Sequence, residues 1–107
     1  MERLFIYGTL GPGRPNEHVM QKIGGEWQAG SVKGRLVKAG WGADMGFPGL
    51  VLDEAGEKIE GHVFVSESLS QHWQILDDFE GSEYQRQLAT VRLQDGETVK
   101  AYVYALR

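Results

Sequence analysis

Leu4-Phe5-Ile6-Tyr7-Gly8, close to the start of the chain, is the stretch from which the fold is inferred. Four consecutive apolar residues that favour β-structure end at a glycine, a pattern typical of a strand buried on both faces. The segment that follows, residues 8–15, holds three glycines and two prolines, which excludes regular structure there. The opening of the sequence therefore predicts a central strand that runs directly into a glycine-rich loop.

Two helices are predicted in the rest of the chain. The first covers residues 16–23, with Asn16 as its N-cap and a pair of glycines after it. The second covers residues 68–79, where apolar residues recur at helical spacing and Ser68 and Gln71 are spaced as a capping box. Both helices are short.

The other segments are predicted to be strands, except for a glycine-rich loop over residues 40–49. Gly30 and Gly34 interrupt residues 26–39, which predicts either one long bent strand or two strands joined by a bulge. The remaining strands are predicted as two hairpins, residues 50–52 with 59–65 around a turn at 53–58, and residues 84–93 with 98–105 around Asp95-Gly96.

This order of elements is not the regular alternation of strands and helices found in doubly wound folds, so the fold class is α+β. Strands broken by glycines, with only two short helices, favour a strongly curved sheet or a small barrel. A chain of 107 residues leaves room for one domain, residues 1–107, and no internal repeat or linker divides it.

Composition excludes several classes of function. Apolar residues make up 41% of the chain and charged residues 24%, as in ordinary folded domains. The formal net charge of −4 argues against nucleic acid as a partner. The absence of cysteine removes disulfides, zinc–thiolate sites and thiol nucleophiles, and fits a reducing cytoplasm. With neither a signal peptide nor a membrane span in the sequence, we expect a soluble cytoplasmic protein.

Common cofactor and nucleophile motifs are also absent. The first loop lacks the lysine of a phosphate-binding loop and the spacing of a dinucleotide fingerprint. The three histidines, His18, His62 and His72, stand alone, and no serine lies in a nucleophile elbow. We therefore expect no metal, no cofactor and no serine hydrolase chemistry.

Two features remain that could carry chemistry. One is the loop after the first strand, whose backbone N–H groups could converge on a carboxylate or an oxyanion, unless it is a plain connection. The other is the acidic segment from Asp77 to Glu83 at the end of the second helix, which could equally be a solvated surface. If Glu80 turns inward while Asp77 and Asp78 stay in water, then burial, neighbouring acids and the helix terminus would all favour its protonated form, as suits a general acid/base.

Four motifs occur in a fixed order along the chain: Phe5-Ile6-Tyr7-Gly8-Thr9-Leu10, Phe47-Pro48-Gly49-Leu50, Ile59-Glu60-Gly61-His62-Val63-Phe64, and Leu76-Asp77-x-x-Glu80-Gly81 followed by Tyr84-x-Arg86. In this order they resemble the motifs of the γ-glutamylcyclotransferase-like superfamily, which includes the AIG2-like and BtrG-like proteins. The resemblance runs from residue 4 to the final Tyr102-Val103-Tyr104 segment. It implies a small mixed β-barrel with flanking helices and no cofactor.

The resemblance also implies roles for individual residues. Backbone groups of Tyr7, Gly8, Thr9 and Leu10 would hold the γ-glutamyl part of a small substrate, and Glu80 would be the catalytic acid/base. Tyr84 would line the pocket or pack in its strand. Arg86 would support the sheet or pair with an acid, unless it is an exposed charge on its strand. We also expect a positive φ at Gly8, which would forbid a β-branched residue there.

The implied reaction closes 5-oxoproline and expels an amine, which could be an amino acid, an isopeptide-linked lysine, a polyamine or another amine. The alternative from a different class is a non-catalytic module of the same fold that binds a small ligand without turnover.

Overall fold

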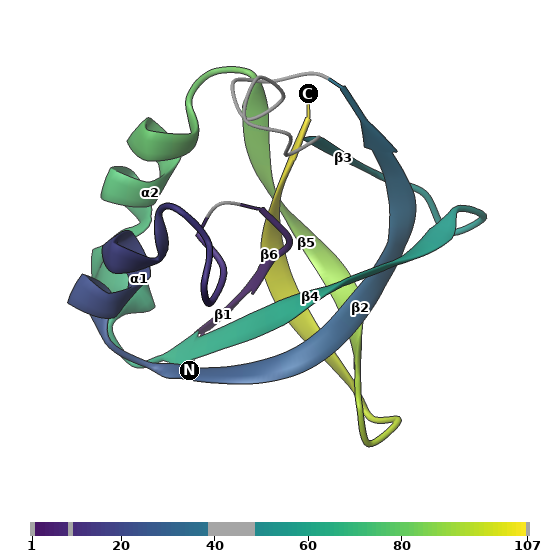
Figure 1. The fold of residues 1–107 in the computed structure, drawn as a ribbon, viewed down its shortest axis with the longest axis horizontal. Coiled ribbons are helices and arrows are strands. Elements are labelled where there is room, and N and C mark those ends of the chain that lie inside the picture. Colours follow the sequence, from purple (N-terminus) through teal and green to yellow (C-terminus); the bar gives the residue numbers. More distant parts are fainter. Residues whose placement is uncertain (1, 9, 39–48, 107) are drawn as a thin grey trace.

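The computed structural model describes residues 2–8, 10–38 and 49–106. The predicted loop at residues 40–49 therefore lies outside the described residues, apart from Gly49, and so does Thr9. Along the chain (Figure 1) the elements are β1 (Glu2–Ile6), α1 (Glu17–Ile23), β2 (Glu26–Val37), β3 (Gly49–Leu52), β4 (Glu57–Ser66), the 3-10 helix η2 (Leu69–Gln71), α2 (Trp73–Glu80), β5 (Tyr84–Leu93) and β6 (Thr98–Leu106).

The strands form a closed mixed barrel with one added strand. β1 lies between β4, to which it is antiparallel, and β6, to which it is parallel. β4 pairs with β2 and β6 pairs with β5, and the ring closes where Gly30 and Ser31 of β2 meet Leu93 and Arg92 of β5. A Cβ atom at Gly30 would lie 2.9 Å from Val91 Cγ1 and 3.0 Å from the carbonyl oxygen of Arg92, so this close approach favours glycine. The predicted α+β barrel with two short helices is confirmed.

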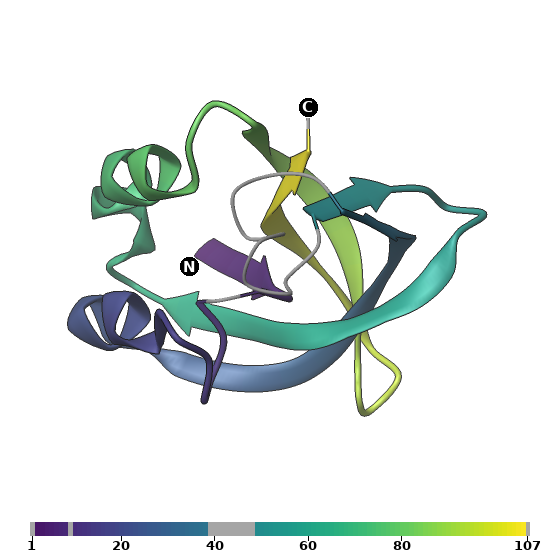
Figure 2. The ribbon, with the colours of Figure 1, turned by 45° about the horizontal axis from the view of Figure 1, so that its top comes forward.

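β1 is buried on both faces, as predicted for a central strand. Leu4 and Ile6 belong to a cluster that also contains Met20 of α1 and Leu76 of α2. Phe5 belongs to a second cluster, which fills the barrel with side chains from all five of its strands. Figure 2 shows both helices on the same flank of the barrel, and each contributes a buried side chain to the first cluster. Each fully buried side chain of this kind contributes about 1.5–3 kcal/mol, so β1 gives the loop after it a rigid base.

The predicted hairpin of residues 50–52 with 59–65 is wrong. Within the described residues no pairing joins β3 and β4, and both strands pair with β2 instead. The turn after β3 also lies against β2, because the Asp53 N–H donates to the Lys33 carbonyl at 3.2 Å. β2 is one bent strand of 12 residues, the first of the two predicted alternatives, and it is long enough to pair with both neighbours. The turn residues between β3 and β4 cannot predict that both strands pair with the distant β2 in place of each other.

The second predicted helix begins later than expected and has no capping box. The Ser68 side chain makes no cap hydrogen bond, and the backbone leaves helical geometry at His72, between η2 and α2. Ser66 makes the side-chain hydrogen bonds at this point of the chain instead. Its hydroxyl donates to the Gly24 carbonyl at 2.6 Å and accepts the Ser68 N–H at 3.0 Å. Among the described residues, no helix has the length and apolar character needed to cross a bilayer.

Candidate active site

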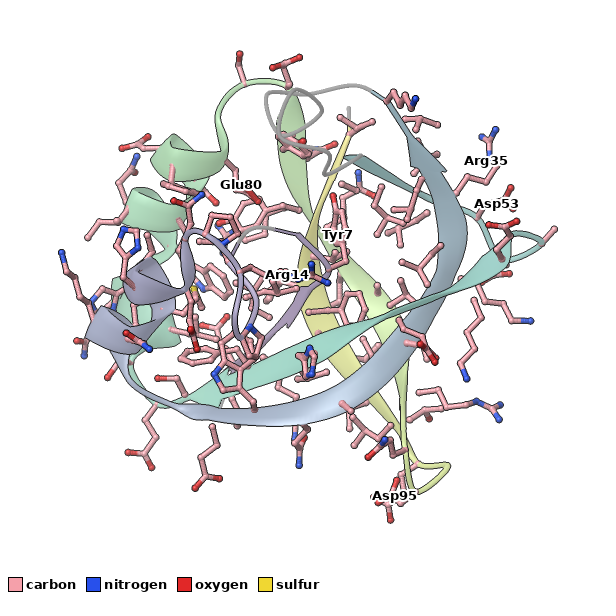
Figure 3. The ribbon with its side chains drawn as sticks, viewed as in Figure 1. Tyr7, Arg14, Arg35, Asp53, Glu80 and Asp95 are labelled. Carbon is pink, nitrogen blue, oxygen red and sulfur yellow. The ribbon has the colours of Figure 1, made fainter. Side chains whose placement is uncertain are left out.

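Glu80 is the last residue of α2. Gly81 ends the helix with a φ of 88°, and its N–H donates to the Asp77 carbonyl at 3.0 Å. This left-handed turn, which glycine adopts at little cost, leads the chain back to β5. Figure 3 shows the Glu80 side chain directed from the end of α2 toward the barrel, on the side of Tyr7.

Burial raises the pKa of the Glu80 carboxyl group to about 7, from an ordinary value of 4.5. The sequence suggested that neighbouring acids and the helix end would contribute, but burial is the cause that the structure gives. The hydroxyl groups of Tyr7, Tyr84 and Tyr104 have pKa values raised chiefly by their own burial, and the Glu80 charge raises them further. The carboxyl group therefore lies within electrostatic range of tyrosines from three parts of the barrel.

The loop after β1 is built from consecutive turns. The Gly11 N–H donates to the Gly8 carbonyl at 3.2 Å, the Arg14 N–H to the Gly11 carbonyl at 3.0 Å, and the Glu17 N–H to the Arg14 carbonyl at 3.1 Å. Within the described residues, the N–H groups of Gly8 and Leu10 have no hydrogen-bond partner. The loop therefore has backbone donors to offer a ligand, as the sequence interpretation required.

Gly8 differs from the expectation in its conformation. Its φ is not positive, so the prediction of a left-handed backbone there is wrong. A Cβ atom at Gly8 would meet no described atom within 4 Å beyond its chain neighbours, so the space beside it is open. The Leu10 side chain, in contrast, is buried in the core. Only the backbone of Leu10 can therefore face a ligand.

Asp77 stays partly exposed but is held in an ion pair, whereas Asp78 is exposed. Two nitrogens of the Arg86 guanidinium pair with the Asp77 carboxylate. Nε lies 3.2 Å from Oδ1, and Nη2 donates to Oδ2 at 3.4 Å. The guanidinium also lies over the Trp73 ring, 4.3 Å from its centroid. Arg86 thus pairs with an acid, one of its expected roles, and ties α2 to β5.

Tyr104 of β6 connects the helix that carries Glu80 with Tyr7, at the start of the loop after β1. Its hydroxyl donates to Asp77 Oδ1 at 2.6 Å, one helical turn before Glu80. Its main-chain carbonyl accepts the Tyr7 hydroxyl at 2.7 Å, and that hydroxyl accepts the Leu50 N–H at 3.0 Å. The sequence analysis missed Tyr104 because the only signal was a tyrosine in a strand, far along the chain from Tyr7.

Within the described part of the chain, three of the candidate residues, Tyr7, Gly8 and Tyr84, border two hollows. Tyr7 and Gly8 line a groove of about 660 Å³, whereas the buried Tyr84 lines another of about 590 Å³ together with Asp77 and Tyr104. The Glu80 charge raises the pKa of both Tyr7 and Tyr84, so the same carboxyl group acts on a tyrosine of each hollow. In the part of the chain that the structure describes, no cluster of three acidic or histidine side chains could hold a metal ion.

Known proteins match this chain along nearly its whole length. Residues 4–107 match the family model described as gamma-glutamyl cyclotransferase, AIG2-like. A relative from Drosophila melanogaster, named "Putative gamma-glutamylcyclotransferase CG2811", is 30% identical over 118 residues that cover 98% of this chain and 69% of the relative.

Two solved structures extend the match to the fold. An AIG2-like protein from Mus musculus has a TM-score of 0.74 and 32% identity, with 98% of this chain and 76% of the mouse chain covered. YkqA from Bacillus subtilis also has a TM-score of 0.74, with 28% identity and coverage of 99% of this chain and 36% of its own. On the evidence of the family model and these relatives, the chain belongs to the gamma-glutamyl cyclotransferase, AIG2-like family and is a cyclotransferase-like enzyme.

Proposed function

We propose that this enzyme converts a γ-glutamyl amine or γ-glutamyl peptide into 5-oxoproline and a free amine, with Glu80 as the general acid/base. The observation that carries the proposal is the partly buried Glu80 carboxyl group at the end of α2, whose pKa is raised by burial to about 7. A group that gains and loses a proton near neutral pH is suited to acid–base catalysis. The family match supports the class of reaction.

The reaction needs no nucleophile from the enzyme. The α-amino nitrogen of the substrate attacks its own γ-carbonyl carbon, and the Glu80 carboxylate accepts the proton that the nitrogen loses. When the tetrahedral intermediate collapses, the bond from carbon to the leaving nitrogen breaks and Glu80 returns the proton to that nitrogen. Atoms and charge balance without water, and the chain accordingly contains no cysteine for covalent catalysis.

The loop after β1 has a separate role in this proposal. The N–H groups of Gly8 and Leu10, which lack partners among the described residues, donate to the carbonyl oxygen as it gains negative charge. Tyr7, Thr9 and Tyr84 complete the binding surface for the γ-glutamyl part. We place the activity in the cytoplasm, in one domain formed by residues 1–107, and the cysteine-free composition supports a reducing compartment.

The test is release of 5-oxoproline from a panel of γ-glutamyl compounds by the purified protein. Glu80→Gln is expected to lower kcat by about 10²–10⁴-fold while KM changes little, because the amide keeps the shape of the side chain but cannot accept a proton. Glu83→Gln is the matched control: the same chemical change in an exposed residue close to the same helix end, with kcat retained. Full activity of Glu80→Gln would refute the role of Glu80, and binding of the panel without turnover would favour the non-catalytic module.

A further inference from the structure

The groove that Tyr7 and Gly8 line continues away from the candidate catalytic residues. Its other walls are the outer faces of β4 and β2 and the residues that lead into the turn between β5 and β6. We call this hollow of about 660 Å³ the loop groove. Its volume falls within the range of about 300–1,000 Å³ that is usual for small-molecule sites. The loop groove can therefore hold a molecule of the size of an amino acid or a short peptide.

The charged side chains of the loop groove are mostly cationic. Arg14, Lys58 and Arg92 line it, against the single carboxylate of Glu60. Lys58 pairs with Glu60 at 3.7 Å, but both side chains are largely exposed, so their interaction is weak. Arg92 forms no ion pair within the described residues. The excess of positive charge contrasts with the chain as a whole, which has a formal net charge of −4.

The strands hold the backbone of Arg92 in place, and its side chain is exposed. Arg92 pairs with Ser31 where β2 and β5 close the barrel, and the neighbouring Val91 is fully buried inside. Because side chains alternate along a strand, Arg92 lies on the outer face, at the groove. An arginine on a rigid strand can hold a carboxylate through two parallel hydrogen bonds.

We propose that the loop groove binds the amine part of the substrate and selects amines that carry a carboxylate, with Arg92 as the main anchor. This inference rests on the proposed function. If the γ-carbonyl oxygen is held by the Gly8 N–H and the glutamyl part lies toward Glu80, the leaving amine extends past Gly8 on the groove side. A carboxylate on that amine meets the cationic side chains, whereas a polyamine would meet charges of its own sign.

The experiment compares matched pairs of γ-glutamyl compounds. The leaving amines are glycine, β-alanine and 4-aminobutyrate, each set against the alkylamine with the carboxyl group removed: methylamine, ethylamine and propylamine. We expect kcat/KM for the acid to exceed that for its alkylamine by about tenfold in the pair whose length matches the distance to Arg92. This ratio should fall as salt is added, because salt screens the exposed charges.

Arg92→Gln is expected to reduce the acid-to-alkylamine ratio about three- to tenfold. The matched control is Arg35→Gln, which removes an exposed arginine of β2 outside the loop groove, paired with Asp53 at 3.6 Å, and should leave the ratio as it is. Equal kcat/KM within every pair, or a ratio that Arg92→Gln does not change, would overturn the inference and leave the proposed function standing. Failure of both sets of compounds to release 5-oxoproline would overturn the proposed function itself.

Discussion

Glu80→Gln should make the stability of the protein respond differently to pH, and this prediction needs no substrate. Burial raises the pKa of the folded-state carboxyl group from 4.5 to about 7. Between these values the folded protein binds a proton that the unfolded chain has released, so the free energy of unfolding falls as pH rises through this window. At about 1.36 kcal/mol per pKa unit, the full loss is about 3 kcal/mol, complete slightly above pH 7 and absent below about pH 4.

Glutamine carries no such penalty, so the variant should gain up to about 3 kcal/mol relative to the wild type between pH 4 and pH 8. Urea denaturation of both proteins at the two pH values measures this change, and any pH-independent effect of the amide on hydrogen bonding cancels in the comparison. Glu83→Gln, in an exposed position, should show little of this change. A stability difference between Glu80→Gln and wild type that is the same at pH 4 and pH 8 would contradict the burial of a neutral carboxyl group.

Three further variants test other parts of the site. Tyr104→Phe, which removes the hydroxyl bond to Asp77, should lower kcat several-fold and shift the pH profile of kcat near neutral pH, whereas Tyr102→Phe on the same face of β6 should do neither. Gly8→Val should keep a wild-type thermal midpoint, since its Cβ has open space, yet raise KM at least tenfold by occupying the ligand's place. Gly61→Ala should lose about 1–3 kcal/mol in urea denaturation, because its Cβ would overlap the main chain of β1. Unchanged activity in Tyr104→Phe, unchanged KM in Gly8→Val or unchanged stability in Gly61→Ala would each refute the corresponding argument.

Local sequence patterns predicted the elements whose stability is local. The Asp95-Gly96 turn between β5 and β6 forms as expected, with a φ of 91° at Gly96, because the turn itself dictates the conformation. The first strand was predicted at nearly its observed place, Glu2–Ile6, because burial of Leu4, Phe5 and Ile6 on both faces leaves a continuous apolar run. In contrast, the hairpin expected after Leu50 failed because β2 competes for both strands, and no local pattern records that competition.

For the candidate site, too, local features could be predicted from the sequence and long-range contacts could not. The sequence offered an inward-turned Glu80 as one of two possibilities for the acidic segment, and the pKa that burial raises to about 7 agrees with that possibility. The hydrogen bonds that hold the site could not be predicted, because they join residues through the closed barrel. Asp77 meets Tyr104 only because β6 lies beside β1 in the middle of the sheet. The conformation of Gly8 was also missed, since a glycine in a loop does not reveal the sign of its φ.

The parallel pairing of β1 with β6 has a consequence for biosynthesis. Tyr7 and Tyr104 are 97 positions apart, so their hydrogen bond closes a long loop of the chain, at an entropic cost of about 4 kcal/mol. On the ribosome, the edge of β1 that pairs with β6 stays without a partner until β6 has left the exit tunnel. The link from Tyr7 through Tyr104 to the helix that carries Glu80 can form only then, so the candidate site is assembled after β6 has been synthesised and not before.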